Sequence, residues 1–209
     1  MRLAKPSDAA SIAQIHYGSR KQLSTGFFSI AGKFFLKQYY SIVLDNPYSV
    51  VVCVEDENRR ICGFASGTLD AQAHFANLKN SRIRLGLALL PSIVRKPRIL
   101  VEALSRYRST ELESEGQFVI TSGARGEFWV WDAASKDTVW AGVLNDAHLR
   151  IFRSLGVKTL RFEVDTENPD VVGYSLKNGA VVIDTIALAD GRTRYIMEYN
   201  LRVKYGRSR

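Results

Sequence analysis

A strand, a helix and a second strand in the later half of the chain restrict its fold more than any other feature. Residues 127–131 are rich in aromatic and β-branched side chains and predict a strand. Residues 137–154 carry apolar side chains at helical spacing, and Gly156 follows where a glycine commonly ends a helix. Residues 159–164 predict the next strand. Two strands joined by such a helix are typical of a right-handed parallel crossover, so we expect an α/β unit over residues 126–200.

The rest of the chain supplies further elements around this unit. Apolar spacing predicts helices, and β-rich runs predict a hairpin and two late strands. These elements are the helices 9–21 and 31–44, the hairpin strands 50–54 and 61–65, a helix that starts near Pro169, and the strands 181–188 and 194–201. With 209 residues, of which 46% are hydrophobic, the chain can build one full core, so we expect a single domain over residues 1–209.

The segment from about residue 70 to 115 differs in character, because basic residues are interspersed with Leu, Ile and Val there. Pro91 and Pro97 interrupt it, which predicts two or three amphipathic helices inserted into the domain. One interpretation is a solvated basic face. The other is a lid or docking surface, with a peripheral membrane or polyanion contact through residues 79–108. The net charge of +8 favours an anionic partner without identifying it.

The cysteines, the histidines and the apolar runs indicate the cellular compartment and the kinds of site to expect. Cys53 and Cys62 flank a polar turn and would face each other across a regular hairpin. We expect both as free thiols in a reducing cytoplasm, with a disulfide or redox pair as the alternative. The three histidines show no ligand spacing, so no metal site is expected. Residues 1–6 lack the apolar region of a signal peptide, and no run reaches the roughly 18 apolar residues that span a bilayer.

The stretch from Gly156 to Gly179 also carries a resemblance. A strand runs from the first glycine to Asn168, and a short helix bearing Tyr174 follows and is closed by Gly179. This order resembles the last conserved region of the Gcn5-related N-acetyltransferases. The resemblance implies an α/β fold of the α+β kind, with a mixed, mostly antiparallel central sheet of six to seven strands. It implies that the sheet is splayed between the fourth and fifth strands, with flanking helices and a helical insertion.

In that family the co-substrate acetyl-CoA places its pantetheine arm between the splayed strands, and the following loop and helix start hold the pyrophosphate. The family's pyrophosphate pattern falls on residues 136–141, and a slip of one residue would recruit Gly142. Val139 stands where the family has its first glycine, and Asp137 adds a carboxylate near the pyrophosphate. The resemblance implies as cofactor-binding residues Trp131, Lys136, Thr138, Val139, Trp140, Ala141, Gly142 and Asn168.

Glu127 is the candidate general base for the attacking amine, because the resemblance places it near the start of the strand that borders the cofactor. Strand alternation predicts that Glu127 shares a face with Trp129 and Trp131. The alternative for Glu127 is a carboxylate at the strand edge or in a salt bridge. The weaker candidates for a base are Asp132, Glu163 and Asp165.

The family often places an acid tyrosine seven residues after the asparagine, where it protonates the departing thiolate. That position is Ser175 in this chain, and its hydroxyl is a weak proton donor. Tyr174 lies one residue earlier, which is a turn of about 100° around a helix. Tyr174 is nevertheless the candidate acid, because it is the tyrosine nearest to that position in the sequence. The alternative for Tyr174 is a position in the core.

Three classes of function remain open at this point. The first is an acetyl-CoA-dependent N-acetyltransferase that moves an acetyl group to a primary amine of a small molecule or sugar by direct attack in a ternary complex. The second is a catalytically inactive binding or regulatory module of the same fold, which Asp137, Val139 and Ser175 favour. The third is nucleic-acid or membrane binding through the basic segment. We expect no specific nucleic-acid partner, because the sequence contains no nucleic-acid motif.

Overall fold

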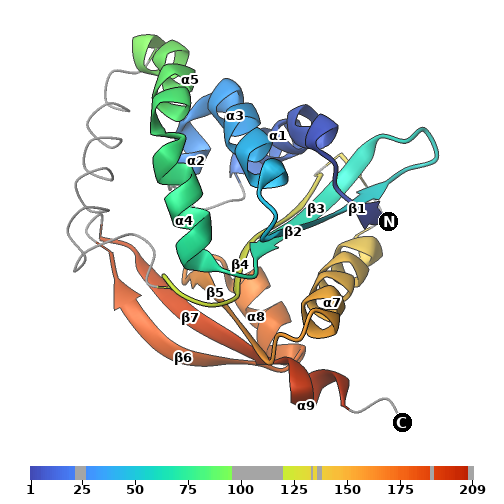
Figure 1. Ribbon diagram of the computed structural model, residues 1–209. Coiled ribbons are helices and arrows are strands. Elements are labelled where there is room, and N and C mark those ends of the chain that lie inside the picture. The colour runs from blue at the N-terminus through green and yellow to red at the C-terminus, as the bar shows by residue number, and fades with distance from the viewer. Residues whose placement is uncertain (22–26, 96–119, 133, 136–137, 189–190, 207–209) are drawn as a thin grey trace.

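A seven-stranded sheet is the framework of the protein, as its computed structural model shows (Figure 1). The structure describes residues 1–21, 27–95, 120–132, 134–135, 138–188 and 191–206. The strands lie in the order β1-β2-β3-β4-β5-β7-β6. Their bounds are β1 Arg2–Leu3, β2 Ser49–Glu55, β3 Ile61–Thr68, β4 Arg125–Trp131, β5 Thr159–Asp165, β6 Ala180–Ala187 and β7 Thr193–Asn200.

Neighbouring strands run antiparallel except for β4 and β5, which run parallel. Among the described residues, β4 and β5 pair only where Arg125 meets Arg161. Beyond that point the two strands diverge, which divides the sheet into a β1–β4 half and a β5–β7 half. The mostly antiparallel sheet that the sequence predicts, splayed between its fourth and fifth strands, is confirmed.

Helices cover both faces of this sheet. Helices α1 and α3 pack on one face of the β1–β4 half, and α7 packs against β2 and β3 from the other face (Figure 1). Helix α8 lies against β6, beyond the divergence. The helix bounds are α1 Ala9–Gly18, α2 Phe27–Ile30, α3 Gly32–Asp45, α4 Ala71–Asn80, α5 Arg82–Arg95, α7 Val139–Ser154, α8 Pro169–Lys177 and α9 Leu201–Tyr205.

Helices α4 and α5 form the described part of the predicted basic insertion. Asp70 begins α4, because its side chain accepts a hydrogen bond from the Ala73 amide at 3.1 Å. Helix α5 packs against α3, where Ser92 Oγ donates to the Ala31 carbonyl at 2.8 Å. Residues 96–119, which include the rest of that predicted insertion, lie outside the described residues. Within the described residues, no helix is both long and apolar enough to cross a membrane.

The two cysteines are free thiols, as the sequence predicts. Their expected pairing across a regular hairpin is wrong, because an irregularity shifts the register between Val54 and Glu55. Cys53 therefore pairs with Phe64. Burial raises the pKa of the Cys53 thiol to about 11, so that this side chain acts as an apolar core residue.

Candidate active site

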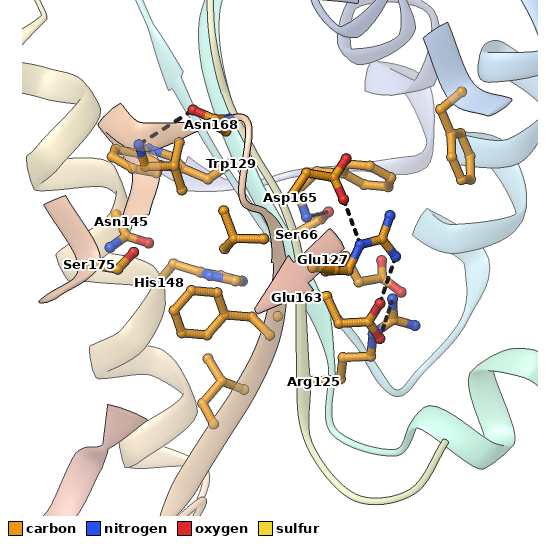
Figure 2. Close-up of a pocket in the computed structure, with 18 of the residues that line it drawn as sticks. Ser66, Arg125, Glu127, Trp129, Asn145, His148, Glu163, Asp165, Asn168 and Ser175 are labelled. Carbon is orange, nitrogen blue, oxygen red and sulfur yellow. Dashed lines mark hydrogen bonds and ion pairs between the residues drawn. The ribbon is translucent and has the colours of Figure 1, made fainter. Parts of the chain in front are cut away.

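A cavity of about 240 Å³ opens between the two halves of the sheet. Its walls come from α1, α3 and α4 on one side of the diverging strands, and from α7, α8 and β7 on the other. Figure 2 shows Arg125, Glu127 and Glu163 on the first side and Asn145 and Ser175 on the second. The cavity therefore has two chemically different sides, which meet where β4 leaves β5.

A β-bulge sets the direction of the Glu127 side chain. Gly67 of β3 pairs with Gly126, and Ser66 pairs with Phe128, so Glu127 is an extra residue in β4. The bulge turns Glu127 to the side of α3 and α4 (Figure 2). Phe128 faces the same side, where its ring centroid lies 6.3 Å from that of Tyr39. The predicted face shared by Glu127, Trp129 and Trp131 is wrong for this reason.

The Glu127 carboxylate is buried against α4. Its Oε1 lies 3.0 Å from His74 Nε2, and the two side chains are only 4% and 3% exposed. Glu127 Oε2 and His74 Nδ1 are buried, and neither has a hydrogen-bond partner among the described residues. Tyr39 of α3 lies nearby, and its pKa is raised well above the usual value by burial and then by the charge of Glu127. An uncommitted carboxylate oxygen in a cavity can accept a proton or a hydrogen bond from a ligand.

The other acidic side chains on this side of the cavity are engaged by arginines. Asp165 accepts hydrogen bonds from Arg192 and from Arg194, each at 2.7 Å. Glu163 accepts one from Arg194 at 2.8 Å, and Arg125 lies 3.7 Å from it. Because both carboxylates are held in these ion pairs, they form a wall of the cavity. Asp132, the remaining alternative, pairs with Arg60 at 2.6 Å and does not line the cavity.

The second side of the cavity is built from Trp129, Asn145, His148, Ser175 and Tyr199, together with apolar neighbours. Burial lowers the pKa of His148 to about 4, so this imidazole is neutral at pH 7. Its Nε2 donates to the Val50 carbonyl at 3.1 Å, which joins α7 to β2. His148 is therefore a structural residue that lines the cavity, and it has no free proton to offer through Nε2.

Tyr174, the candidate acid, does not line this cavity. Its hydroxyl donates to the Gly142 carbonyl at 3.2 Å, and its ring centroid lies 4.7 Å from that of Trp129. A Cβ atom at Gly142 would come within 3.2 Å of the Tyr174 hydroxyl, so the glycine permits this approach. Tyr174 thus packs α8 against the start of α7, while Ser175 faces the cavity.

Tyr199 brings a second tyrosine hydroxyl to the same place. It extends from β7, and its buried hydroxyl has no hydrogen-bond partner that the described residues supply. Burial raises the pKa of Tyr199, while the neighbouring Ser175 and Asn145 lower it by a smaller amount. Both His74 and Tyr199 were missed from the sequence, because neither lies in a recognisable motif.

The predicted cofactor-binding residues mostly gather around the start of α7. Thr138, Val139 and Trp140 are exposed in its first turn, where backbone N–H groups lack partners within the helix. Trp129 Nε1 donates to the Ala141 carbonyl at 2.9 Å, which fixes this turn to β4. Lys136 and Asp137 lie outside the described residues.

Two further predicted residues lie on either side of this turn. Asn168 lines the cavity and caps α8 by accepting from the Val171 amide at 3.4 Å (Figure 2). Trp131 packs its indole over Gly63 and does not line the cavity.

Two features could hold the co-substrate that the resemblance implies, namely the main chain of β4 and the start of α7. The Glu127 side chain is 4% exposed while the residue as a whole is partly exposed, so its accessible surface is main chain. That open main chain lies beside the divergence of β4 from β5, where a ligand's amide groups can find hydrogen bonds. The N-terminus of α7 offers an anion site at the end of the same strand. Among the described residues, no group of three His, Cys, Asp or Glu side chains could hold a metal ion.

Comparison with known proteins finds a likeness in structure alone, and that likeness concerns the fold. No family model matches the sequence, and no curated protein matches it. The spermidine/spermine N-acetyltransferase SpeG from Vibrio cholerae, solved in mutant forms, is similar with a TM-score of 0.56 and 15% identity. That match covers 100% of this chain and 96% of that chain.

Two other solved structures show the same likeness. A putative phosphinothricin N-acetyltransferase has a TM-score of 0.58 and 15% identity, with 96% of each chain covered. The aminoglycoside 6'-acetyltransferase type Ii has a TM-score of 0.56 and 11% identity, with 96% of this chain and 97% of that chain covered. The chain therefore has the fold of the Gcn5-related N-acetyltransferases, which its sequence predicts.

Proposed function

We propose that this protein is an N-acetyltransferase that moves an acetyl group from acetyl-CoA to a primary amine of a small molecule or sugar. The observation that carries the proposal is the buried Glu127–His74 pair, whose free carboxylate oxygen lies in the cavity where β4 leaves β5. The similar proteins named above are N-acetyltransferases, two of them named for spermidine/spermine and aminoglycoside acetylation.

Residues of β4 and α7 would hold the co-substrate. The open main chain around Glu127 would bind its pantetheine amides, and the N–H groups at Thr138, Val139 and Trp140 would bind its pyrophosphate. When bound, acetyl-CoA supplies an activated acetyl group as a thioester. The same strand would offer N–H groups to the carbonyl oxygen as negative charge develops on it.

Glu127 would accept the proton that the amine must lose. The first side of the cavity, with Arg125, Glu127 and Glu163, would be the acceptor side, and the second, with Asn145 and Ser175, would be the cofactor side. Glu127 Oε2 is buried and unpartnered, while Oε1 is held by His74. His74 would then act as a positioning residue, because it fixes the carboxylate through one oxygen and leaves the other free. A positioned base contributes a factor of about 10² to 10⁴ to the rate.

Tyr199 would return a proton to the departing thiolate. Its hydroxyl is buried on the cofactor side, next to Ser175, which stands at the family's acid position. Tyr174 keeps its hydroxyl on the Gly142 carbonyl, away from the cavity. The two proton transfers would thus be divided between the two sides of the cavity, with Glu127 on one and Tyr199 on the other.

The test begins with binding. Purified protein is titrated with acetyl-CoA by calorimetry and then assayed on a panel of amines that includes polyamines and amino sugars. We expect binding, and acetylation of at least one amine that falls by about 10² or more in Glu127→Gln while acetyl-CoA affinity is retained. Glu198→Gln is the matched control, because Glu198 pairs with Arg161 outside the cavity and should leave activity unchanged.

Two results would contradict the proposal. Absence of binding at millimolar acetyl-CoA would favour the alternative, a non-catalytic module of the same fold. Full activity in Glu127→Gln would remove Glu127 from the reaction.

A further inference from the structure

The outward face of α5 carries a stripe of four large apolar side chains. Ile83, Leu87, Leu90 and Val94 follow one another at intervals of four, three and four residues, which places them on one side of the helix. They are 72%, 60%, 51% and 82% exposed. Such a continuous line of exposed aliphatic groups is uncommon on a surface that meets only water.

This stripe is not the face by which α5 joins the core. Ala88 and Leu89 are buried, Leu85 and Ile93 are partly buried against the core, and Ser92 bonds to the Ala31 carbonyl. A helix needs one apolar face to dock on its own domain, and α5 already has one against α3. Within the part of the chain that the structure describes, the second apolar face is left uncovered and can receive a partner.

The charged side chains of α5 are all basic. No Asp or Glu occurs between Asp70 and Glu102 in the sequence. At about 100° per residue, Arg82 falls on one flank of the stripe, and Arg84 and Arg95 fall on the other. All three are exposed. Long cationic side chains on the flanks of an apolar helix face can reach anionic groups while the apolar groups are buried.

We propose that the stripe of Ile83, Leu87, Leu90 and Val94 binds an anionic lipid surface, with α5 lying in the plane of the membrane. The aliphatic side chains would enter the boundary between headgroups and acyl chains, and Arg82, Arg84 and Arg95 would contact lipid phosphates. A second copy of this chain fits less well, because a symmetric contact would bring the same cations together without a carboxylate on the helix to oppose them.

The surface is connected to the cavity through α4. Helix α4 precedes α5 directly and carries His74, Phe75 and Leu78, which line the acceptor side. Helix α4 therefore links the helix that bears the stripe to residues that line the cavity. The lipid contact itself does not depend on the proposed acetyl transfer.

The experiment is flotation of the full chain with vesicles, measured at low and high salt. One set contains phosphatidylcholine alone, and the other contains equal parts of phosphatidylcholine and phosphatidylglycerol. We expect the protein to float with the anionic vesicles and to bind more weakly as salt rises. The variant L87S/L90S should bind at least about tenfold more weakly, because two large apolar groups no longer enter the interface.

Further variants test whether the apolar stripe and its flanking arginines are specifically required for lipid binding. V181S/V203S removes two exposed apolar side chains from β6 and α9, and it should bind as the unchanged protein does. R82Q/R84Q should lose the preference for anionic vesicles. Thermal melting should be alike in all of these variants, since the altered side chains are exposed.

Three outcomes would overturn the proposal. One is failure of the unchanged protein to float with anionic vesicles. Another is equal binding by L87S/L90S and the unchanged protein, which would mean that the stripe takes no part. The third is self-association on size exclusion that L87S/L90S abolishes without any lipid binding, which would assign the stripe to a second copy of the chain.

Discussion

The Glu127 carboxylate and the His74 imidazole face each other at 3.0 Å, from a strand and a helix that lie on either side of residues 96–119 in the chain. The bulge in β4 aims Glu127 at α4, and the Asp70 cap starts α4 where His74 falls one turn later. The bulge and the helix cap thus bring the Glu127 carboxylate and the His74 imidazole together where both side chains are buried.

Replacing His74 by Ala should lower kcat by roughly 10- to 100-fold with little effect on acetyl-CoA affinity, because the carboxylate loses the group that fixes it. His74→Gln should recover part of the rate, because its amide can still donate. A merely structural histidine would not be rescued in this way.

The fold could be predicted from the sequence because its signals are local. The strand over 159–164, the helix that starts near Pro169 and its end at Gly179 each follow from neighbouring residues, and the structure has them where the pattern predicts. The splay between β4 and β5 came from the family resemblance. The fold comparison confirms that resemblance at 11–15% identity.

The candidate site could be predicted only in part, because the pairing of β4 with β3 decides which way Glu127 points. Alternation in β4 alone places Glu127 beside the tryptophans, but pairing with β3 inserts the bulge. Gly67 permits this pairing, since a Cβ atom there would come within 2.5 Å of the Arg125 carbonyl oxygen. His74 and Tyr199 reach the cavity from elements distant in the sequence, so no local spacing of residues predicts them as site residues.

Replacing Tyr199 by Phe should lower kcat by about 10- to 100-fold, because the departing thiolate loses its nearby proton donor. The matched control is Tyr174→Phe, which keeps the ring against Trp129 and loses only the bond to the Gly142 carbonyl. Its activity should stay within about twofold of the unchanged enzyme. Steady-state kinetics and acetyl-CoA titration measure both variants. If Tyr174→Phe lost its activity and Tyr199→Phe kept it, Tyr174 would be the proton donor and Tyr199 would not.

Gly63→Ala should destabilise the fold by about 1 to 3 kcal/mol, because the new Cβ atom would lie 2.3 Å from the Trp131 ring and force it to move. The control is Gly86→Ala on α5, where nothing lies within 4 Å of the new atom. That change should stabilise the helix by up to about 1 kcal/mol. Urea unfolding measures both differences. Equal stability of the two variants would mean that Trp131 can shift without cost.

The buried histidines should make the protein less stable as the pH falls below neutral. Burial lowers the pKa of His148 to about 4 and that of His16 to about 3. An unfolded histidine has a pKa near 6.5, so between about pH 6.5 and pH 4 the unfolded state binds more protons than the folded state. The free energy of unfolding should therefore be highest above about pH 6.5. It should fall as the pH drops, by up to about 1.4 kcal/mol per pH unit for each histidine.

His148→Gln isolates one of these contributions, because its amide can still donate to the Val50 carbonyl but does not titrate. The slope of unfolding free energy against pH between 6 and 5 should be smaller in this variant by about one bound proton, roughly 1.4 kcal/mol per pH unit at most. Carboxylate titrations are common to both proteins and cancel in the difference. The measurement is urea unfolding at several pH values. Parallel slopes would show that His148 is protonated in the folded protein, contrary to its burial.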